Sequence, residues 1–182
     1  ITTGFAGAGA FSDGKLSLSP DVGGNLPEIL GYDETVSLLR EADQIYLDFG
    51  ADTAVYGVDK EKEIREIRKK AITANLKLIE CPIRHLGTEE GGKIYAKMQK
   101  HLEEVGVEMK FLTMVEEILI RDGRAEGVRT DGGETYLADQ IVSAVGREGA
   151  DWFSHVCRDQ GIETKVGTVD IGVRVEVRDE VM

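Results

Sequence analysis

The sequence is poor in the residues that mark several large classes of protein. Its 182 residues include two cysteines, three prolines and one tryptophan, and 22 basic side chains stand against 34 acidic ones, for a net charge of −12. Cys81 and Cys157 lie far apart and lack CxxC spacing, which is typical of reduced thiols in a cytosolic protein. The negative charge argues against a nucleic-acid partner, because phosphate binding needs clustered basic side chains. It also gives no support for binding to an anionic membrane surface.

Long apolar runs are also missing. No run approaches the roughly 20 residues that span a bilayer, and no signal segment opens the sequence, so we expect a cytoplasmic protein. His85, His101 and His155 have no ligand-like spacing with cysteine or acidic residues, so we expect no metal site. The remaining composition, 41% hydrophobic and 31% charged, is that of an ordinary globular protein. The length suits one domain, or one domain with a small appendage.

The stretch 107–147 predicts a small antiparallel sheet. Three β-leaning runs, 113–121, 125–130 and 135–137, are separated by Asp-Gly and Asp-Gly-Gly turns, and glycine accepts the positive φ that tight hairpins need. The next run, Gln140–Val145, is nearly all apolar and predicts a strand buried on both faces. This pattern indicates a β-meander that feeds a central strand, although a plain hairpin and strand in any α/β protein would give it too.

Helical spacing predicts four helices around this sheet. The first begins with Asp33 as N-cap and ends at Gly50. The second covers 59–79, with one apolar face and a charged remainder that we interpret as solvated. The third covers 92–105, and a short fourth helix ends at Gly161. The apolar face of the second helix consists of Ile64, Ile67, Ala71, Ala74 and Leu78.

The last part of the sequence alternates between apolar and polar residues. Residues 166–177 have this period of two, which predicts a half-buried strand. Trp152, in the short helix before it, is interpreted as a packing residue rather than as a stacking partner for a ring.

Residues 4–24 are rich in glycine and alanine, which indicates backbone that packs closely against a ligand or another segment. The spacing Gly9-x4-Gly14-Lys15 matches the start of a phosphate-binding P-loop, but Leu16 stands where that motif needs Ser or Thr. The dinucleotide fingerprint GxGxxG is absent, since Gly7-Ala-Gly9 continues with Ala-Phe-Ser. A glycine-rich surface loop remains the other interpretation.

The loop 82–89 carries several hydrogen-bond donors just before a predicted helix. Arg84, His85 and Thr88 lie close together there, and donors at a helix N-terminus form a natural anion site. The alternative is that Thr88 only caps the helix, while Arg84 and His85 are simply exposed.

Four phrases, in this order, resemble a bacterial family of FAD-dependent dehydrogenases of unassigned substrate, with the FAD fold of the glutathione-reductase type. They are Gly-Ala-Gly-Ala-Phe-Ser-Asp-Gly-Lys-Leu in 4–16, Arg-His-x-Gly-Thr in 82–89, Ala-Val-Gly-Arg at 144–147 and Val-Asp-Ile-Gly-Val-Arg-Val-Glu at 169–176. The resemblance implies an α/β protein with a partial three-layer FAD/NAD(P)-binding fold over 1–147. It also implies that an inserted α+β domain begins within 148–182. Glu89 departs from the family, which usually has Asp there.

The resemblance also implies roles for individual residues. Val115 would meet the adenine through its backbone, while Ala144 and Gly146 would allow close approach of the dinucleotide. Arg84 and Thr88 would bind an anionic part of substrate or cofactor. His85 is the candidate general acid or base, because histidine titrates near neutral pH. The loop that would line the flavin and its phosphates, with Ser12 and Lys15 as polar contacts, consists of Gly7, Ala8, Gly9, Ala10, Phe11, Ser12, Asp13, Gly14 and Lys15.

The implied chemistry is hydride transfer through FAD to or from a small-molecule substrate, with NAD(P)H as a possible second cofactor. The GxGxxG unit of the family is not in the sequence. We therefore interpret the chain as an internal piece that alone binds FAD weakly or not at all and is inactive. We also expect the Gly7–Lys15 loop and the end of the Gln140–Val145 strand to share one groove. The alternatives are a non-catalytic interaction domain, which binds no flavin, and a P-loop protein, which binds ATP with magnesium.

Overall fold

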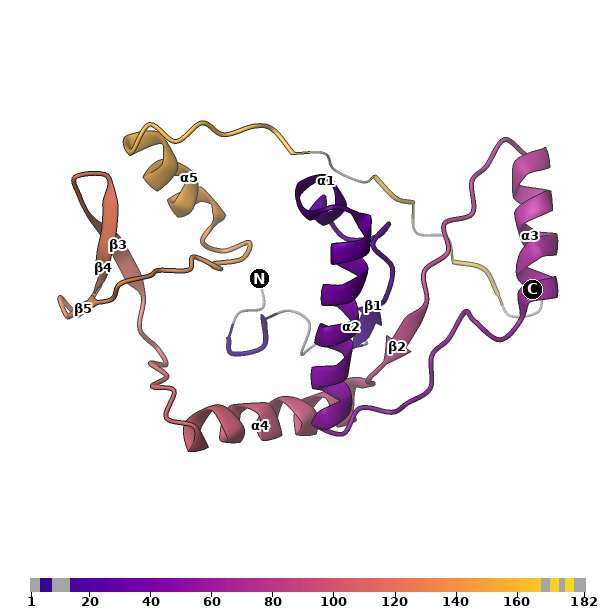
Figure 1. The fold of residues 1–182 in the computed structure, drawn as a ribbon, viewed down its shortest axis with the longest axis horizontal. Coiled ribbons are helices and arrows are strands. Elements are labelled where there is room, and N and C mark those ends of the chain that lie inside the picture. Colours follow the sequence, from indigo (N-terminus) through magenta and orange to yellow (C-terminus); the bar gives the residue numbers. More distant parts are fainter. Residues whose placement is uncertain (1–3, 8–13, 168–170, 174–175, 179–182) are drawn as a thin grey trace. The chain divides into compact units, whose positions relative to one another are not determined.

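The computed structural model describes residues 4–7, 14–167, 171–173 and 176–178. The chain divides into two compact units, Ile1–Leu112 and Thr113–Met182, which are described separately below as the first and second unit. The domain boundary predicted at 147/148 stays a prediction. Figure 1 shows the elements, which in the first unit are β1 (Lys15–Ser17), α1 (Leu26–Leu30), α2 (Tyr32–Asp48), α3 (Glu61–Thr73), β2 (Ile83–His85) and α4 (Thr88–Glu104).

In the first unit, β1 and β2 form a two-stranded antiparallel sheet. Its register pairs Lys15 with His85, Leu16 with Arg84 and Ser17 with Ile83. On the other side of β2, Tyr56 and Ile83 exchange backbone hydrogen bonds of 2.8 and 3.1 Å. Segments far apart in the sequence therefore meet at this sheet. The small core beside it consists of Ala51, Leu86 and Ile94, with Leu16, Tyr46, Leu47, Phe49 and Met98 packed against them.

The helices of the first unit differ from the predicted ones mainly at their ends. α2 begins at Tyr32, so Asp33 lies in its first turn and the prediction of Asp33 as N-cap is wrong. The reason is that the short helix α1 comes directly before it and the chain turns through Gly31, whose φ is 88°. The predicted end at Gly50 is confirmed, since the Gly50 N–H closes the helix onto Leu47 O at 2.9 Å.

α3 is shorter than predicted and ends at Thr73. Asn75 adopts a φ of 57°, and the Leu76 N–H returns to Ala71 O at 2.8 Å, which is a C-terminal cap of the left-handed type. Ala74 and Leu78 therefore do not continue the predicted apolar face. α4 is longer than predicted, because Gly87, with a φ of 72°, starts the helix directly after the loop.

The second unit confirms the predicted β-meander. Its strands β3 (Val115–Arg121), β4 (Arg124–Thr130) and β5 (Thr135–Leu137) form one antiparallel sheet in that order. The two-residue loop between β3 and β4 has positive φ at both Asp122 (52°) and Gly123 (76°), as a type I′ turn requires. α5 (Ala150–Asp159) follows, and Trp152 Nε1 donates a hydrogen bond of 2.8 Å to Glu116 O of β3. Cys157 of this helix is buried.

One predicted strand of the second unit is wrong, and another does not appear in the part of it that the structure describes. Residues 140–145 form no strand, and the Val142 side chain is 89% exposed. A strand buried on both faces needs hydrogen-bonded neighbours, and the described residues place none beside this run. Residues 166–177 also form no strand where they are described, with Ile171 93% exposed, while 168–170 and 174–175 lie outside the described residues.

Candidate functional site

The β1–β2 pairing brings together two of the phrases that carry predicted site residues. Lys15 and His85 are direct partners in the antiparallel register, so their side chains project on the same face of the sheet. The Leu86 N–H donates to Gly14 O at 2.8 Å, and a Cβ on Gly14 would lie 3.0 Å from Leu86 Cβ. Gly14 is therefore required by packing within the protein, whether or not a ligand also approaches it.

The N-terminus of α4 borders these residues. Gly87 is the N-cap, no side chain caps the helix, and the Gly87 nitrogen would lie 3.4 Å from a Cβ on Gly14. Thr88 is the first helical residue and exposed, so the alternative in which Thr88 acts as N-cap is wrong. Backbone N–H groups, a lysine and a histidine lie together here, a combination that suits an anionic group. The carboxylates of Glu89 and Glu90, in the first turn of α4, repel an anionic group at this position. Glu90, however, forms an ion pair with Lys93 at 2.6 Å.

Arg84, by contrast, is turned into the protein. Its side chain is buried, and it donates to the two carboxylate oxygens of Asp43 at 2.6 and 2.7 Å and to Asp52 O at 2.5 Å. Hydrogen bonding to Asp43 raises the pKa of Arg84, against an opposing effect of burial. The guanidinium group therefore ties β2 to α2 and to the loop after α2, and its predicted contact with an anionic ligand has no support from this geometry.

Asp43 is the functional partner that sequence reasoning missed. It lies on α2 between Leu39 and Leu47, four residues from each, so a carboxylate interrupts the apolar face of the helix. A charged residue in such a position indicates a buried partner of opposite sign. That signal was present in the sequence, but nothing in it pointed to Arg84.

The remaining predicted site residues belong to both units. Gly7 forms a turn, with its N–H 2.9 Å from Gly4 O, and residues 8–13 lie outside the described residues. Val115 begins β3 and is half-buried, whereas Ala144 and Gly146 are exposed and belong to an irregular segment. All three lie in the second unit, and the groove that we expect the Gly7–Lys15 loop to share with the end of the 140–145 run stays a prediction.

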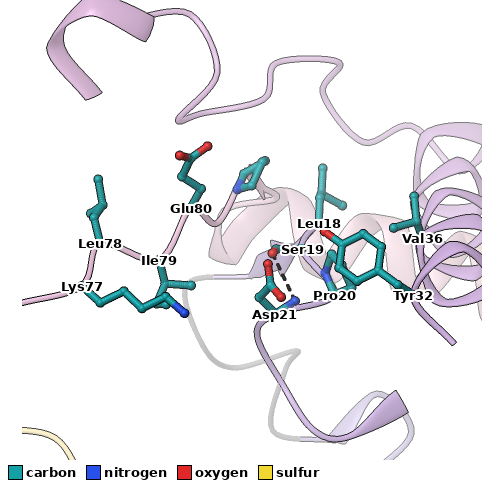
Figure 2. A pocket seen from close by; sticks show the side chains of 11 residues that line it. Leu18, Ser19, Pro20, Asp21, Tyr32, Val36, Lys77, Leu78, Ile79 and Glu80 are labelled. Carbon is teal, nitrogen blue, oxygen red and sulfur yellow. Dashed lines mark hydrogen bonds between the residues drawn. The ribbon is translucent and has the colours of Figure 1, made fainter. Parts of the chain in front are cut away.

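The first unit also contains an open cavity of about 620 Å³ that the sequence did not suggest (Figure 2). The loop after β1, the first turns of α2 and the segment before β2 form its walls. None of the predicted site residues lines it. Its lining combines apolar side chains with three charged ones and consists of Leu18, Ser19, Pro20, Asp21, Tyr32, Val36, Lys77, Leu78, Ile79, Glu80 and Pro82.

The described residues contain neither a membrane-spanning helix nor a group of metal-ligating side chains. No helix there combines the length and the apolar character that crossing a bilayer requires. Within the same residues, no three His, Cys, Asp or Glu side chains gather into a group that could hold a metal ion. The cytoplasmic location stays a prediction.

Comparison with known families defines the class of this protein. The described residues form a mixed helix and strand fold with small antiparallel sheets, which is compatible with part of a nucleotide-binding domain. The family model described as pyridine nucleotide-disulphide oxidoreductase matches residues 48–180. This match covers most of the sequence, and the chain therefore belongs to that family. No curated protein matches the chain.

Proposed function

We propose that this chain is part of an FAD-dependent dehydrogenase that passes hydride between NAD(P)H, or a small-molecule substrate, and a flavin. The family match supports oxidoreductase chemistry with these cofactors in general terms. The narrower proposal, a dehydrogenase of the bacterial group that the four phrases resemble, rests on those phrases.

The observation that carries the proposal is the register of β1 and β2. It sets Lys15 opposite His85, and it brings Gly14 against the N-cap of α4. Two phrases separated by about 70 residues in the sequence thus meet, and their exposed residues Lys15 and His85 form one polar surface beside the N-terminus of α4.

This surface fits the anionic part of a dinucleotide. Lys15 supplies a positive charge, and the first N–H groups of α4 supply donors for phosphate oxygens. FAD, when bound, would supply the hydride transfer, while the protein supplies binding and electrostatics. His85 is exposed at the edge of the surface, where it could hold or release a proton as substrate reacts. The expected contacts of Val115 with the adenine, and of Ala144 and Gly146 with the dinucleotide, stay predictions.

Neither unit contains a pair of cysteines for disulphide chemistry. Cys81 lies in the first unit and Cys157 in the second, and both are free thiols. We therefore propose that electrons pass between flavin and a small molecule and not through a dithiol formed within either unit.

The proposal is tested by measuring how much flavin is bound to the full polypeptide that the gene encodes. After desalting we expect visible flavin absorption, and we expect Lys15→Ala to weaken FAD binding by about tenfold, as loss of a charge-assisted hydrogen bond would. Lys93→Ala is the matched control, because Lys93 is exposed on α4 and forms an ion pair with Glu90. A colourless gene product that takes up no FAD would contradict the proposal and favour a non-catalytic interaction domain.

The extended backbone at Lys15 argues against the P-loop alternative. In a P-loop the lysine opens a helix whose N–H groups surround the phosphates. Here Lys15 begins β1 and is paired with β2, so the backbone around it is extended.

A further inference from the structure

The open cavity of the first unit lies at the far end of the β1–β2 sheet from the polar surface of Lys15 and His85. Those two residues form the pair at one end of the antiparallel register. Beyond the last pair at the other end, the Leu18 N–H donates a hydrogen bond of 2.9 Å to Pro82 O, and both residues line the cavity. The cavity is therefore a second site, distinct from the surface that we assign to a dinucleotide.

Hydrogen bonds within the protein hold two walls of this cavity in place. In the loop after β1, the Asp21 N–H donates to Ser19 Oγ at 3.3 Å, and Ser19 is buried. At the start of α2, the buried Thr35 donates its hydroxyl to Gly31 O at 2.8 Å, which fixes the turn that carries Val36. The positions of Asp21 and Val36 are therefore set before any ligand binds, as is usual for small-molecule sites.

Two charged side chains of the lining, Asp21 and Lys77, have opposite signs and remain uncommitted. In Figure 2 the Lys77 side chain extends from the segment before β2 toward Asp21. Within the described part of the chain, neither the Asp21 carboxylate nor the Lys77 ammonium group forms a hydrogen bond or an ion pair. Glu80, the third charged residue of the lining, forms an ion pair with Arg68 of α3. The cavity therefore offers a ligand one charge of each sign.

The rest of the lining supplies apolar surface. Leu18 and Val36 are half-buried, and Ile79 is 43% exposed. The volume of about 620 Å³ lies within the range of roughly 300–1,000 Å³ that is typical of small-molecule sites. The cavity therefore has room for a molecule that carries both charges and an apolar group.

We propose that this cavity binds a small zwitterion with an apolar side chain, of the class of the free aliphatic amino acids. The ammonium group of the ligand lies on the Asp21 carboxylate, and its carboxylate lies on the Lys77 ammonium group. The apolar side chain packs against Leu18 and Val36. An ion of one sign would pair with only one of the two charged residues, whereas a zwitterion pairs with both. Because the cavity is open to water, each ion pair is screened and binding is weak.

Saturation-transfer NMR tests the proposal, with L-leucine added to the full polypeptide that the gene encodes. We expect a dissociation constant of about 1 mM or below. L-Alanine should bind at least about threefold more weakly, because its smaller side chain buries less apolar surface. The measurement does not depend on flavin content, so its result is independent of the proposed dehydrogenase function.

Two analogues of leucine, each lacking one charge, test the two charged contacts separately. L-Leucinamide lacks the carboxylate, 4-methylpentanoate lacks the ammonium group, and each should bind about threefold more weakly than leucine. Lys77→Met should weaken leucine binding by a similar factor and leave leucinamide binding within about twofold. Asp21→Asn should likewise weaken leucine binding and leave 4-methylpentanoate binding within about twofold. Because each variant still binds one analogue, loss of leucine binding is not due to unfolding.

Lys69→Met is the matched control, because Lys69 is exposed on α3 and does not line the cavity, and it should leave leucine binding unchanged. Three results would overturn the proposal. Absence of leucine binding up to about 10 mM would show that the cavity is no such site. Equal affinity for leucine and both analogues would show that the charges play no part. Equal weakening of leucine and leucinamide by Lys77→Met would exclude the contact between Lys77 and the carboxylate.

Discussion

Arg84 joins three segments of the first unit through one guanidinium group. Its two contacts with Asp43 are parallel and charge-assisted, and the remaining donor reaches the backbone carbonyl of Asp52. Both charged side chains are largely withdrawn from solvent, with 5% and 15% of their surfaces exposed. Removing one member of such a pair leaves an uncompensated buried charge, and this penalty, rather than the net contribution of the pair, sets the effect of mutation.

We therefore predict that Arg84→Met lowers the free energy of unfolding by about 3 kcal/mol, measured by urea denaturation. Arg84→Lys should also destabilise, because a point charge cannot reproduce the two parallel hydrogen bonds. The double variant Arg84→Met with Asp43→Leu should recover much of the loss, since no charge is then left buried. Arg65→Met on α3 is the control. An effect of Arg84→Met below about 0.5 kcal/mol would show that the pair is solvated.

For individual residues, the sequence shows which side chains need a buried partner, but it does not show which residue that partner is. The carboxylate of Asp43 in the apolar face of α2 predicts a buried cation. Its partner lies 41 residues away, on a strand of three residues whose pairing depends on the fold of the whole first unit. Similarly, glycine at position 14 indicates close backbone approach, and only the structure shows Leu86 as the neighbour.

Two neighbouring strands of the β-meander, β4 and β5, pack closely against each other at Gly127. Gly127 of β4 faces Leu137 of β5, and a Cβ at this position would lie 2.5 Å from Tyr136 O and 3.2 Å from Leu137 Cα. Both contacts are with backbone atoms, which cannot move aside as the end of a side chain could. β5 can approach β4 this closely only because position 127 has no side chain.

We predict that Gly127→Ala destabilises the second unit by about 1–3 kcal/mol, because β5 must shift or detach. Trp152 is the only tryptophan and lies in this unit, so its fluorescence during urea unfolding is a local probe. Gly132→Ala is the matched control, since the nearest atom to its Cβ would be Thr130 Oγ1 at 3.8 Å. Equal stability of the two variants would contradict the observed register.

Elements whose formation is local were predicted well from the sequence. The meander has its turns encoded at Asp122-Gly123 and 131–133, and all three of its strands appear where expected. The strands expected at 140–145 and 166–177 depend instead on neighbours supplied by distant segments. Apolar or alternating sequence predicts a buried position for such runs, but it does not provide the hydrogen-bonded edge that makes them strands.

For the molecule as a whole, the main feature is the large amount of apolar surface that both units leave exposed. Ile29, Leu76, Leu112, Val142 and Ile171 are all more than 60% exposed, whereas the described residues bury few hydrophobic side chains completely. The family match, residues 48–180, includes Leu76, Leu112, Val142 and Ile171 but not Ile29. Surfaces of this kind usually face another segment, a partner or a ligand.

A substitution at Val142 tests whether residues 140–145 lie in water, as the structure has them, or form the buried strand that their sequence predicts. Val142→Asp should change the unfolding free energy of the chain by no more than about 0.5 kcal/mol, because the side chain already lies in water. Val128→Asp is the comparison, since Val128 is half-buried in the centre of the meander between Ile118 and Tyr136, and it should cost about 2 kcal/mol. Urea unfolding followed by Trp152 fluorescence measures both. If Val142→Asp proves as damaging as Val128→Asp, the run 140–145 is buried in solution, and the strand expected from its sequence forms after all.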